Sequence, residues 1–301
     1  MFENLPTVPK SQDLLDKAFR RASRYAKSDE SAVMVAGNIL ADNLANLIRK
    51  FPSFETLPPF YREIVEIIIG VDAIRLKLSR LQWASQQIRK ITRTSLSDMK
   101  HSDDSAFYKK AALGRMSSVI KSIDKDLEFL KESREKLRWI PTLDPELPTI
   151  LVAGFPNVGK SSFISQITDA KPKIASYPFT TKEIQIGHFT RGHQKYQVVD
   201  TPGLFDRPFE DRNQIERQAI AALRHLKGAV IFIIDPSEHS GYRLEPQLHL
   251  AEEIKSWIDL PILIVSNKSD LTTCEGVMGM SSLTGEGISE VVDRLATLLK
   301  Y

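Results

Sequence analysis

The segment GFPNVGKS, Gly154 to Ser161, constrains the fold of this chain more than any other. It matches the pattern G-x-x-x-x-G-K-[ST], whose glycines let the backbone curl so that its N–H groups point inward at phosphate oxygens. The apolar run TILVA precedes it and the helix-compatible run SFISQI follows it, which is the strand–loop–helix setting that the pattern requires. The bare pattern arises by chance in roughly one chain of this length in a hundred. In this setting an accidental glycine loop falls below about one in fifty.

The residues of this loop have separate predicted roles. Lys160 should reach the β- and γ-phosphates of a nucleotide, and the Ser161 hydroxyl should bind Mg²⁺. The N-terminus of the following helix adds partial positive charge. The predicted phosphate-binding residues are Phe155, Pro156, Asn157, Val158, Gly159, Lys160, Ser161 and Ser162.

After residue 148, short apolar runs alternate with helical stretches. The runs are TILVAG, EIQIGHFT, YQVVD, GAVIFIID, PILIVSN and VMGMS, and helices fit residues 160–168, 211–226, 243–256 and 287–299. Nearly all-apolar strands that alternate with helices predict a mainly parallel sheet covered on both faces.

The first half of the chain has a helical pattern instead. Apolar residues recur at three- and four-residue steps around 71–92 and 112–130, and shorter helices fit 11–27 and 31–50. Residues 103–105 are the predicted cap of the 112–130 helix, and Pro58 and Pro59 are predicted to open the 71–92 helix. An antiparallel helical bundle would bury all these apolar stripes.

The segment WIPTLDPELP, residues 139–148, holds three prolines and predicts a domain boundary. We therefore expect a helical bundle over 1–140, a proline-rich linker over 141–148 and an α/β domain over 149–301.

The net charge differs between the two sides of this boundary. Residues 1–148 carry 25 Lys and Arg against 20 Asp and Glu, a net of +5, and residues 149–301 carry 16 against 18, a net of −2.

Two further segments complete the predicted phosphate and metal site. DTPGL, Asp200 to Leu204, follows the strand YQVV, so Asp200 is expected to hold Mg²⁺ through water and the Gly203 N–H to meet the γ-phosphate. YPFTTKE, Tyr177 to Glu183, is expected to supply Thr181 to Mg²⁺ when the γ-phosphate is present, with Thr180 as the alternative.

The segment NKSD, Asn267 to Asp270, predicts the base. A carboxylate only accepts hydrogen bonds, so Asp270 can take both N–H donors on the pyrimidine edge of guanine, a donor pair that adenine lacks. Asn267 can tie this loop to the phosphate loop, the Lys268 stem can pack over the ring, and in SSLTGEG, residues 281–287, the Ser282 N–H would face the guanine oxygen. The predicted guanine-binding residues are Asn267, Lys268, Asp270, Ser281, Ser282 and Leu283.

These motifs, in this order and wording, resemble a known family. GFPNVGKSS, YPFTTKEIQIGH and QVVDTPGL resemble the Obg-related branch of translation-linked GTPases. KKAALGRMSSVIK, the junction IPTLDPELPTILVAGFPNVGKSS and EDRNQIERQAIAALRHL then resemble the nucleolar GTP-binding protein (Nog) family, most clearly from about residue 60 to 285. The resemblance implies a helical bundle before a P-loop GTPase domain, in a short, archaeal-type member.

The resemblance also implies what the chain does. We expect a Mg²⁺-dependent GTPase that acts as a switch in assembly of the large ribosomal subunit, with that subunit or its precursor, rRNA and ribosomal proteins as partners. The alternatives are a GTP-gated scaffold on RNA or the ribosome with negligible hydrolysis, and a GTPase in another RNA process. Asp270 disfavours an ATPase.

Two residues predict the mechanism. Many small GTPases have a glutamine after D-x-x-G that orients the attacking water, and Leu204 stands there in this chain. We therefore expect slow turnover without an activator, with Lys160, Thr181, Gly203 and Mg²⁺ supplying the charge stabilisation. In related GTPases an asparagine at the position of Asn157 binds K⁺, and we weigh that role about evenly against simple bracing of the loop.

A basic stripe is the candidate RNA surface of the helical half. Arg75, Gln82, Gln86, Arg89 and Arg93 recur at helical spacing, and Lys109, Lys110, Arg115, Lys121 and Lys125 add charge nearby. Such a surface can contact RNA phosphates without reading sequence. From the residues alone an ordinary exposed face is favoured about two to one, and the resemblance reverses that preference.

Composition excludes several other classes. A single cysteine, Cys274, excludes a disulfide framework, and the six histidines have no zinc-ligand spacing. No secretory signal is visible, and no apolar run approaches the roughly 18 residues that span a bilayer. We expect a cytoplasmic monomer without a membrane partner.

Overall fold

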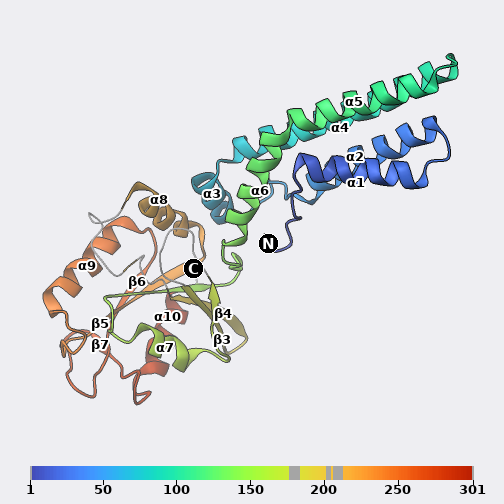
Figure 1. The fold of residues 1–301 in the computed structure, drawn as a ribbon. Coiled ribbons are helices and arrows are strands. Elements are labelled where there is room, and N and C mark those ends of the chain that lie inside the picture. The colour runs from blue at the N-terminus through green and yellow to red at the C-terminus, as the bar shows by residue number, and fades with distance from the viewer. Residues whose placement is uncertain (1, 176–183, 201–204, 206–212, 300–301) are drawn as a thin grey trace. The chain divides into compact units, whose positions relative to one another are not determined.

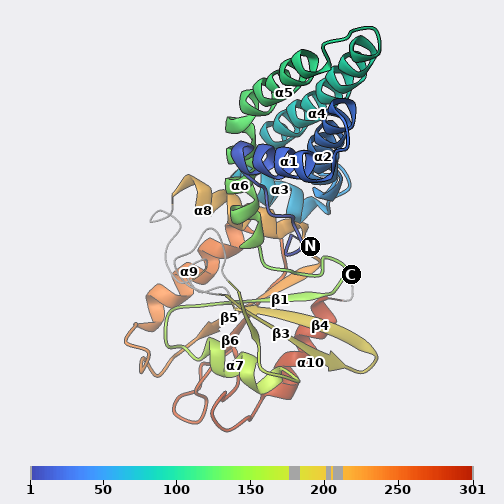
Figure 2. The same cartoon turned by 45° about the vertical axis from the view of Figure 1, so that its right-hand side comes forward.

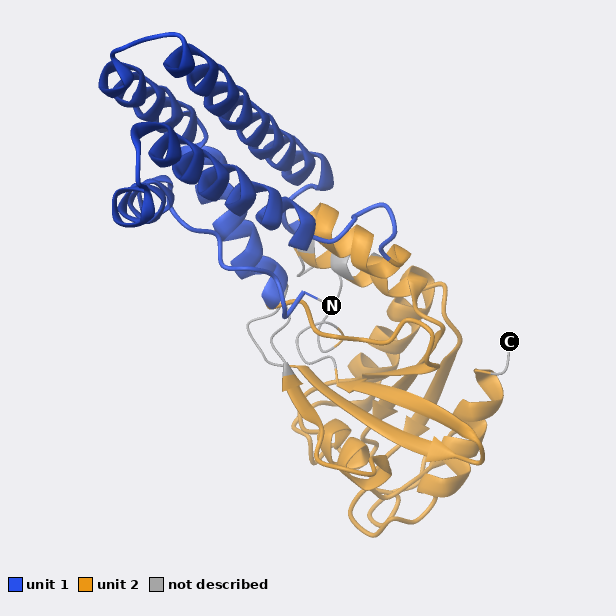
Figure 3. Ribbon diagram, turned by 90° about the vertical axis from the view of Figure 1, so that its right-hand side faces the viewer, with its two compact units in different colours: residues 1–57, 68–138 blue, residues 58–67, 139–301 orange. Residues whose placement is uncertain are grey.

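The structure is a computed structural model, and it describes residues 2–175, 184–200, 205 and 213–299. The chain divides into two compact units, coloured blue and orange in Figure 3. The first unit holds residues 1–57 and 68–138, and the second holds residues 58–67 and 139–301. The segment 58–67, which the sequence assigns to the bundle, groups with the second unit. The predicted domain boundaries otherwise stay a prediction.

The first unit is the predicted bundle of helices. Its helices are α1 (Ser11–Tyr25), α2 (Asp29–Lys50), α4 (Val71–Lys100), α5 (Ser105–Ser122) and α6 (Asp124–Arg138), and Figure 1 shows α4 and α5 running side by side. Helix α2 packs against α1, α4 and α5, so its apolar residues form the core. Val33, Ala36, Leu40 and Leu44 are fully buried there.

A glycine allows the close approach of two of these helices. A Cβ on Gly37 of α2 would lie 2.0 Å from the Thr92 Oγ1 of α4, a distance that no real side chain reaches. Among the described residues, α2 is also the one helix long and apolar enough to cross a membrane. The apolar residues of α2 are explained by its packing inside the bundle.

Two predictions for the helical half are wrong. The stretch 112–130 is not one helix, because α5 ends at Ser122 and α6 begins at Asp124. The new first turn brings Asp126 within 2.9 Å of the Lys77 amine and 2.7 Å of the Arg80 guanidinium of α4, which offsets the burial of its carboxylate. The cap predicted over residues 103–105 is confirmed, because Asp104 is the N-cap of α5 and its side chain accepts from the Phe107 N–H.

The second wrong prediction concerns the two prolines before the long helix. Pro59 opens a separate short helix, α3 (Pro59–Ile68), and α4 begins only at Val71. Gly70 lies between them with φ of +88°, in the left-handed region that glycine adopts without a steric cost.

The second unit is a mainly parallel α/β domain, as the sequence predicts. Its described part holds a seven-stranded sheet of order β2-β3-β4-β1-β5-β6-β7. Strand β3 runs antiparallel to β2 and β4, and the other neighbouring pairs are parallel. The strands are β1 (Thr149–Ala153), β2 (Lys173–Ala175), β3 (Ile184–Arg191), β4 (Gln194–Asp200), β5 (Gly228–Ile234), β6 (Ile262–Ser266) and β7 (Met278–Gly279).

Helices cover both faces of this sheet. They are α7 (Lys160–Ile167), α8 (Gln214–Ala222) with a 3₁₀ turn over Leu223–His225, α9 (Leu244–Trp257) and α10 (Ile288–Leu298). Figure 2 shows α7 and α10 on one side of the sheet and α9 on the other. Because both faces are covered, β1 is buried throughout, and so is β5 after its first residue. The carboxyl ends of β1, β4, β5 and β6 thus meet at one edge, where open α/β sheets bind ligands.

Helix α3 belongs to the core of the second unit. Phe60, Ile64 and Val65 are fully buried, and the buried Tyr61 hydroxyl donates to the Leu143 carbonyl and accepts from the Leu143 N–H at 2.7 Å. These two bonds fasten α3 to the proline-rich segment 141–148.

The same helix reaches the residues that follow α8. The Glu63 carboxylate lies 2.6 Å from His225 Nε2 and 3.3 Å from the Arg224 guanidinium. Helix α3 is therefore tied by its polar side chains to residues 143, 224 and 225 of the second unit.

Candidate functional site

The loop Gly154–Gly159 joins β1 to α7 and has an unusual backbone. Gly154 and Gly159 have φ of +134° and +102°, and Asn157 has φ of +62°. A Cβ on Gly154 would lie 2.4 Å from the Ile233 carbonyl oxygen of β5. Only glycine fits there, which is the reason for the first glycine of the motif.

Lys160 lies folded over this loop. Its amine donates to the Gly154 carbonyl at 2.9 Å and to the Phe155 carbonyl at 2.7 Å, and the residue is 9% exposed. The ammonium therefore lies inside the curl of the loop, beside the N-terminus of α7. Both put positive charge at the predicted phosphate position.

Ser161 and Asp200 come together from α7 and from the end of β4. The Ser161 hydroxyl donates to Asp200 Oδ2 at 2.9 Å, and Asp200 is 2% exposed. Hydroxyl and carboxylate oxygens are ligands that Mg²⁺ prefers. The donor set fits the predicted magnesium site.

Asn267 joins three loops. Its amide donates to the Val158 carbonyl at 2.7 Å and to Ser282 Oγ at 2.9 Å, and its Oδ1 accepts from the Ser282 N–H at 2.8 Å. The residue is 1% exposed. It thus links the phosphate loop, the NKSD segment and the SSLTGEG segment into one junction.

This junction differs from expectation at one atom. The Ser282 N–H, predicted to face a guanine oxygen, donates to Asn267 here. The buried Asn267 amide needs an acceptor for its N–H groups and a donor for its oxygen. Ser282 supplies both, since its hydroxyl oxygen accepts and its N–H donates.

The remaining predicted guanine-binding residues surround the junction. Ser281 is fully buried, whereas Asp270 is exposed and Leu283 is 82% exposed. The Lys268 amine lies 2.6 Å from Asp235 Oδ2. In the phosphate loop, Val158 is buried, Phe155 is 8% exposed, Pro156 is half-buried, and Asn157 and Ser162 are exposed.

Asp235 is a site residue that the sequence analysis missed. It is fully buried directly after β5, at the same sheet edge as the other site residues. Burial alone would raise the pKa of its carboxyl, but hydrogen bonds from Lys268, Ser237 and the Ser240 N–H hold the pKa below its usual value. The one available signal was an acid at the end of an all-apolar strand.

Four residues of the predicted switch segments, Thr180, Thr181, Gly203 and Leu204, lie outside the described residues. Their predicted roles stay predictions. Within the described ranges, no group of three or more His, Cys, Asp and Glu is arranged to hold a metal ion.

Two arginines of the predicted basic stripe on α4 form ion pairs within the first unit. Arg75 forms an ion pair with Glu55, and the Arg89 guanidinium lies 2.8 Å from the Asp42 carboxylate. Arg93 is exposed, and Trp83 is 46% exposed on the same helix. All five residues of the stripe are exposed, so it faces solvent as the sequence predicts, with Arg75 and Arg89 also held in surface ion pairs.

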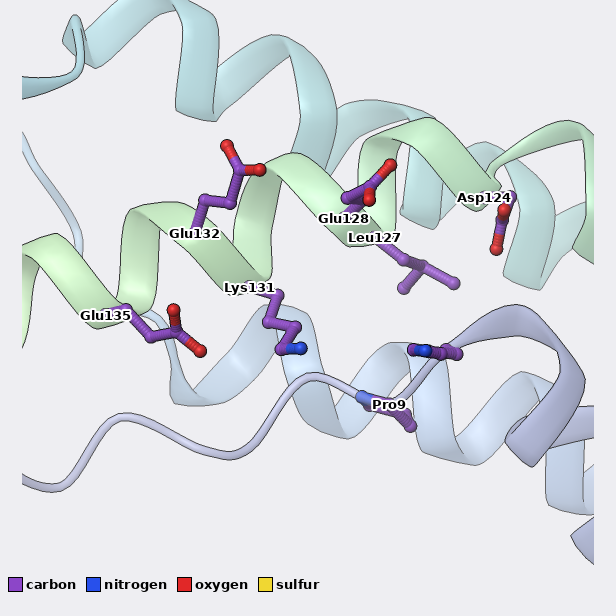
Figure 4. Close-up of a pocket in the computed structure, with 8 residues that line it drawn as sticks. Pro9, Asp124, Leu127, Glu128, Lys131, Glu132 and Glu135 are labelled. Carbon is purple, nitrogen blue, oxygen red and sulfur yellow. The ribbon is translucent and has the colours of Figure 1, made fainter.

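The first unit also has a cavity of about 370 Å³ between α6 and the segment before α1. None of the predicted site residues lines it. Figure 4 shows that its labelled side chains come from both segments, and the full set is Pro9, Lys10, Asp124, Leu127, Glu128, Lys131, Glu132 and Glu135.

Comparisons with known proteins cover both units. Residues 2–144 match the family model "NOG1 N-terminal helical domain", and residues 214–270 match "Nucleolar GTP-binding protein 1 (NOG1)". An uncharacterized protein of Methanocaldococcus jannaschii is 37% identical over 294 residues, which cover 92% of this chain and 83% of that protein.

Eukaryotic relatives are longer than this chain. Nucleolar GTP-binding protein 1 of Caenorhabditis elegans is 36% identical over 288 residues, which are 90% of this chain and 42% of that protein. A crystal structure titled as nucleolar GTP-binding protein 1 from Plasmodium falciparum is 36% identical, has a TM-score of 0.49, and matches over 54% of this chain and 90% of that chain.

Proposed function

This chain belongs to the nucleolar GTP-binding protein 1 (NOG1) family, and we propose that it binds and slowly hydrolyses GTP as a switch on the large ribosomal subunit or its precursor. The observation that carries the nucleotide part is the junction at Asn267, where three loops meet at one edge of the sheet. The ribosomal part rests on the family.

In this proposal the chain's own residues hold the nucleotide. Lys160 and the loop N–H groups bind the phosphates, while Asp270 accepts from the guanine N–H donors. Ser161 and Asp200 would hold Mg²⁺, with Thr181 as a third oxygen ligand. The metal neutralises charge on the β- and γ-phosphate oxygens. Gly203 would donate its N–H to the γ-phosphate, so the two switch segments would respond to its loss.

A GTP-gated scaffold without useful turnover is the second candidate. Leu204 favours it, because this side chain cannot orient a water. Phosphate release measured with and without large ribosomal subunits separates the two. Turnover that stays negligible with subunits present supports the scaffold. A GTPase acting in another RNA process would hydrolyse GTP but ignore the subunits.

Potassium is expected to stimulate hydrolysis if the Asn157 oxygen binds it. GTP turnover should then be about ten-fold or more faster in K⁺ than in Na⁺ buffer, a small part of the roughly 10³–10⁵ that an arginine finger supplies. The measurement is phosphate release at matched ionic strength.

Asn157→Gly is the matched variant for this test. Glycine keeps the positive φ of this position without strain and removes only the amide. It should bind GDP normally and lose the potassium effect. Equal rates in the two salts for the unaltered protein would reduce Asn157 to a brace of the loop.

The whole proposal is tested by co-sedimentation with purified large ribosomal subunits. We expect stronger binding with a non-hydrolysable GTP analogue than with GDP, because only the analogue keeps a γ-phosphate to order the switch segments. Absence of binding with either nucleotide, at intact GTP affinity, would contradict the ribosomal role and leave the GTPase assignment standing.

Charge reversal on α4 is expected to weaken that binding. The change Arg93→Glu should lower subunit affinity by roughly three- to ten-fold and reduce its salt dependence, since it removes one cation from the exposed stripe. GDP affinity should not change. Arg89 is a poorer choice, because its reversal also breaks the pair with Asp42.

The control for this variant is Lys136→Glu on α6. Lys136 is exposed and lies on α6, a different helix from the one that carries the stripe. Equal losses from the two reversals would mean that net charge, rather than the stripe on α4, governs binding.

A further inference from the structure

The loop between β5 and α9, residues 235–243, contacts both halves of the candidate nucleotide site. At its start, Asp235 pairs with Lys268 of the NKSD segment. At its end, the Tyr242 ring lies against the Phe155 ring of the phosphate loop, with centroids 4.7 Å apart. The sequence analysis assigned no role to this loop.

The pair of Asp235 and Lys268 is well shielded. Asp235 is fully buried, and the Lys268 side chain is 23% exposed. Asp235 directly follows β5 and Lys268 lies two residues after β6, so the parallel pairing of these two strands brings the residues together. Lys268 also has φ of +60°, a backbone conformation that costs free energy in a residue with a side chain.

The Asp235 carboxylate is itself fixed by its own loop. Its Oδ2 accepts from the Ser240 N–H at 2.7 Å, and its Oδ1 accepts from the Ser237 N–H at 3.1 Å and from the Ser237 hydroxyl. Both oxygens are thus held before they meet the lysine. The orientation of the carboxylate toward the Lys268 ammonium is therefore fixed.

Gln247 of α9 anchors both ends of this loop. It is fully buried, accepts from the Asp235 N–H at 2.7 Å, and donates to the Tyr242 and Arg243 carbonyls at 3.0 and 3.2 Å. One side chain therefore fixes the loop where it leaves the sheet and where it enters α9. The position of Asp235 is set by the packed core of the domain.

We propose that Asp235 is a positioning residue for guanine recognition, which holds the Lys268 ammonium so that the methylene stem lies flat against the base. This inference rests on the proposed GTP binding. A flexible lysine loses rotamer freedom when it packs on a ring, and a buried partner at its tip removes most of that cost beforehand. The opposite interpretation is a salt bridge that only stabilises the fold.

The test is a double-mutant cycle on GDP and GTP affinity. Asp235→Asn should lower the affinities for GDP and GTP equally, by roughly five- to thirty-fold, because the two nucleotides share the same base. Lys268→Met should cause a similar loss. In the double variant, which removes both charges of the pair, the losses should not add.

His239→Ala is the matched control in the same loop. His239 is exposed, and its ring hydrogen-bonds the Ser237 carbonyl rather than the Asp235 carboxylate, so the nucleotide affinity of this variant should stay within about two-fold of that of the unaltered protein. Thermal melts of each variant report the fold separately from binding.

The possible outcomes separate the inference from the function on which it rests. Additive losses in the cycle, or a lowered melting temperature with unchanged affinity in Asp235→Asn, would overturn the positioning role. Failure of the unaltered protein to bind GDP would instead overturn the proposed function.

Discussion

Replacing Gly159 by alanine should lower GDP affinity by at least about 100-fold. An added Cβ would lie 2.1 Å from the Asn267 amide nitrogen and 3.0 Å from Ser282 Oγ. The amide cannot retreat without losing its 2.7 Å bond to the Val158 carbonyl. The φ of +102° adds strain of about 1–2 kcal/mol, and each lost bond costs about 0.5–1.5 kcal/mol more. Titration with a fluorescent GDP measures the effect.

Gly192→Ala is the control for this substitution. Gly192 has φ of +60° in the turn between β3 and β4, and a Cβ there would meet nothing within 4 Å. It shares the backbone strain of Gly159 but not the collision, so GDP affinity should be unchanged. If Gly159→Ala bound GDP as tightly as Gly192→Ala, the junction at Asn267 would not be part of the nucleotide site.

The second large effect is expected from Asp270→Asn. In the proposed site the Asp270 carboxylate would accept two hydrogen bonds from guanine, whereas an asparagine amide offers one donor and one acceptor, which matches xanthine. A site built to hydrogen-bond its substrate rejects an analogue that lacks the partner group by about 10⁴–10⁵-fold. GTP affinity should therefore fall by at least about 100-fold while XTP affinity rises. Competition between the two nucleotides for the same site measures the change.

Asp259→Asn is the matched control. Asp259 is an exposed acid that lies before the first residue of β6, whereas Asp270 lies after the last. Its nucleotide preference should remain that of the unaltered protein. A preference for guanine that survives Asp270→Asn would refute the assignment of the base site and would reopen the ATPase alternative.

The sequence predicts local features of this fold well and distant ones poorly. The strand before Gly154 and the helix after it follow from periodicity and the glycine motif, because both depend on neighbouring residues. Strand β2 has only three residues, and Ile174 in it is 66% exposed, so it carries no alternating pattern. The break at Ile123 precedes a turn whose Asp126 pairs with Lys77 and Arg80 of α4, and periodicity reveals neither the break nor these distant contacts.

The same distinction between local and distant features holds for the residues of the candidate site. Lys160, Ser161, Asn267 and Asp270 were predicted from motifs that fix residue types at short spacing. Asp235 was missed, because its partner Lys268 lies 33 residues along the chain and the pairing depends on two strands being neighbours. The pairing of Arg89 with Asp42 was missed for the same reason, since it joins two different helices.

The position of α3 bears on how the chain acquires its fold. Synthesis proceeds from the N-terminus, so Phe60, Tyr61 and Ile64 are made long before Leu143, Arg224 and His225. Through that interval, the bonds of Tyr61 to Leu143 and of Glu63 to Arg224 and His225 cannot form. The whole of α4, α5 and α6 can fold meanwhile, and the entropy of joining ends across such a long loop grows only slowly with length. The second unit is therefore completed by a segment made early, and a chain started at residue 139 would lack these bonds.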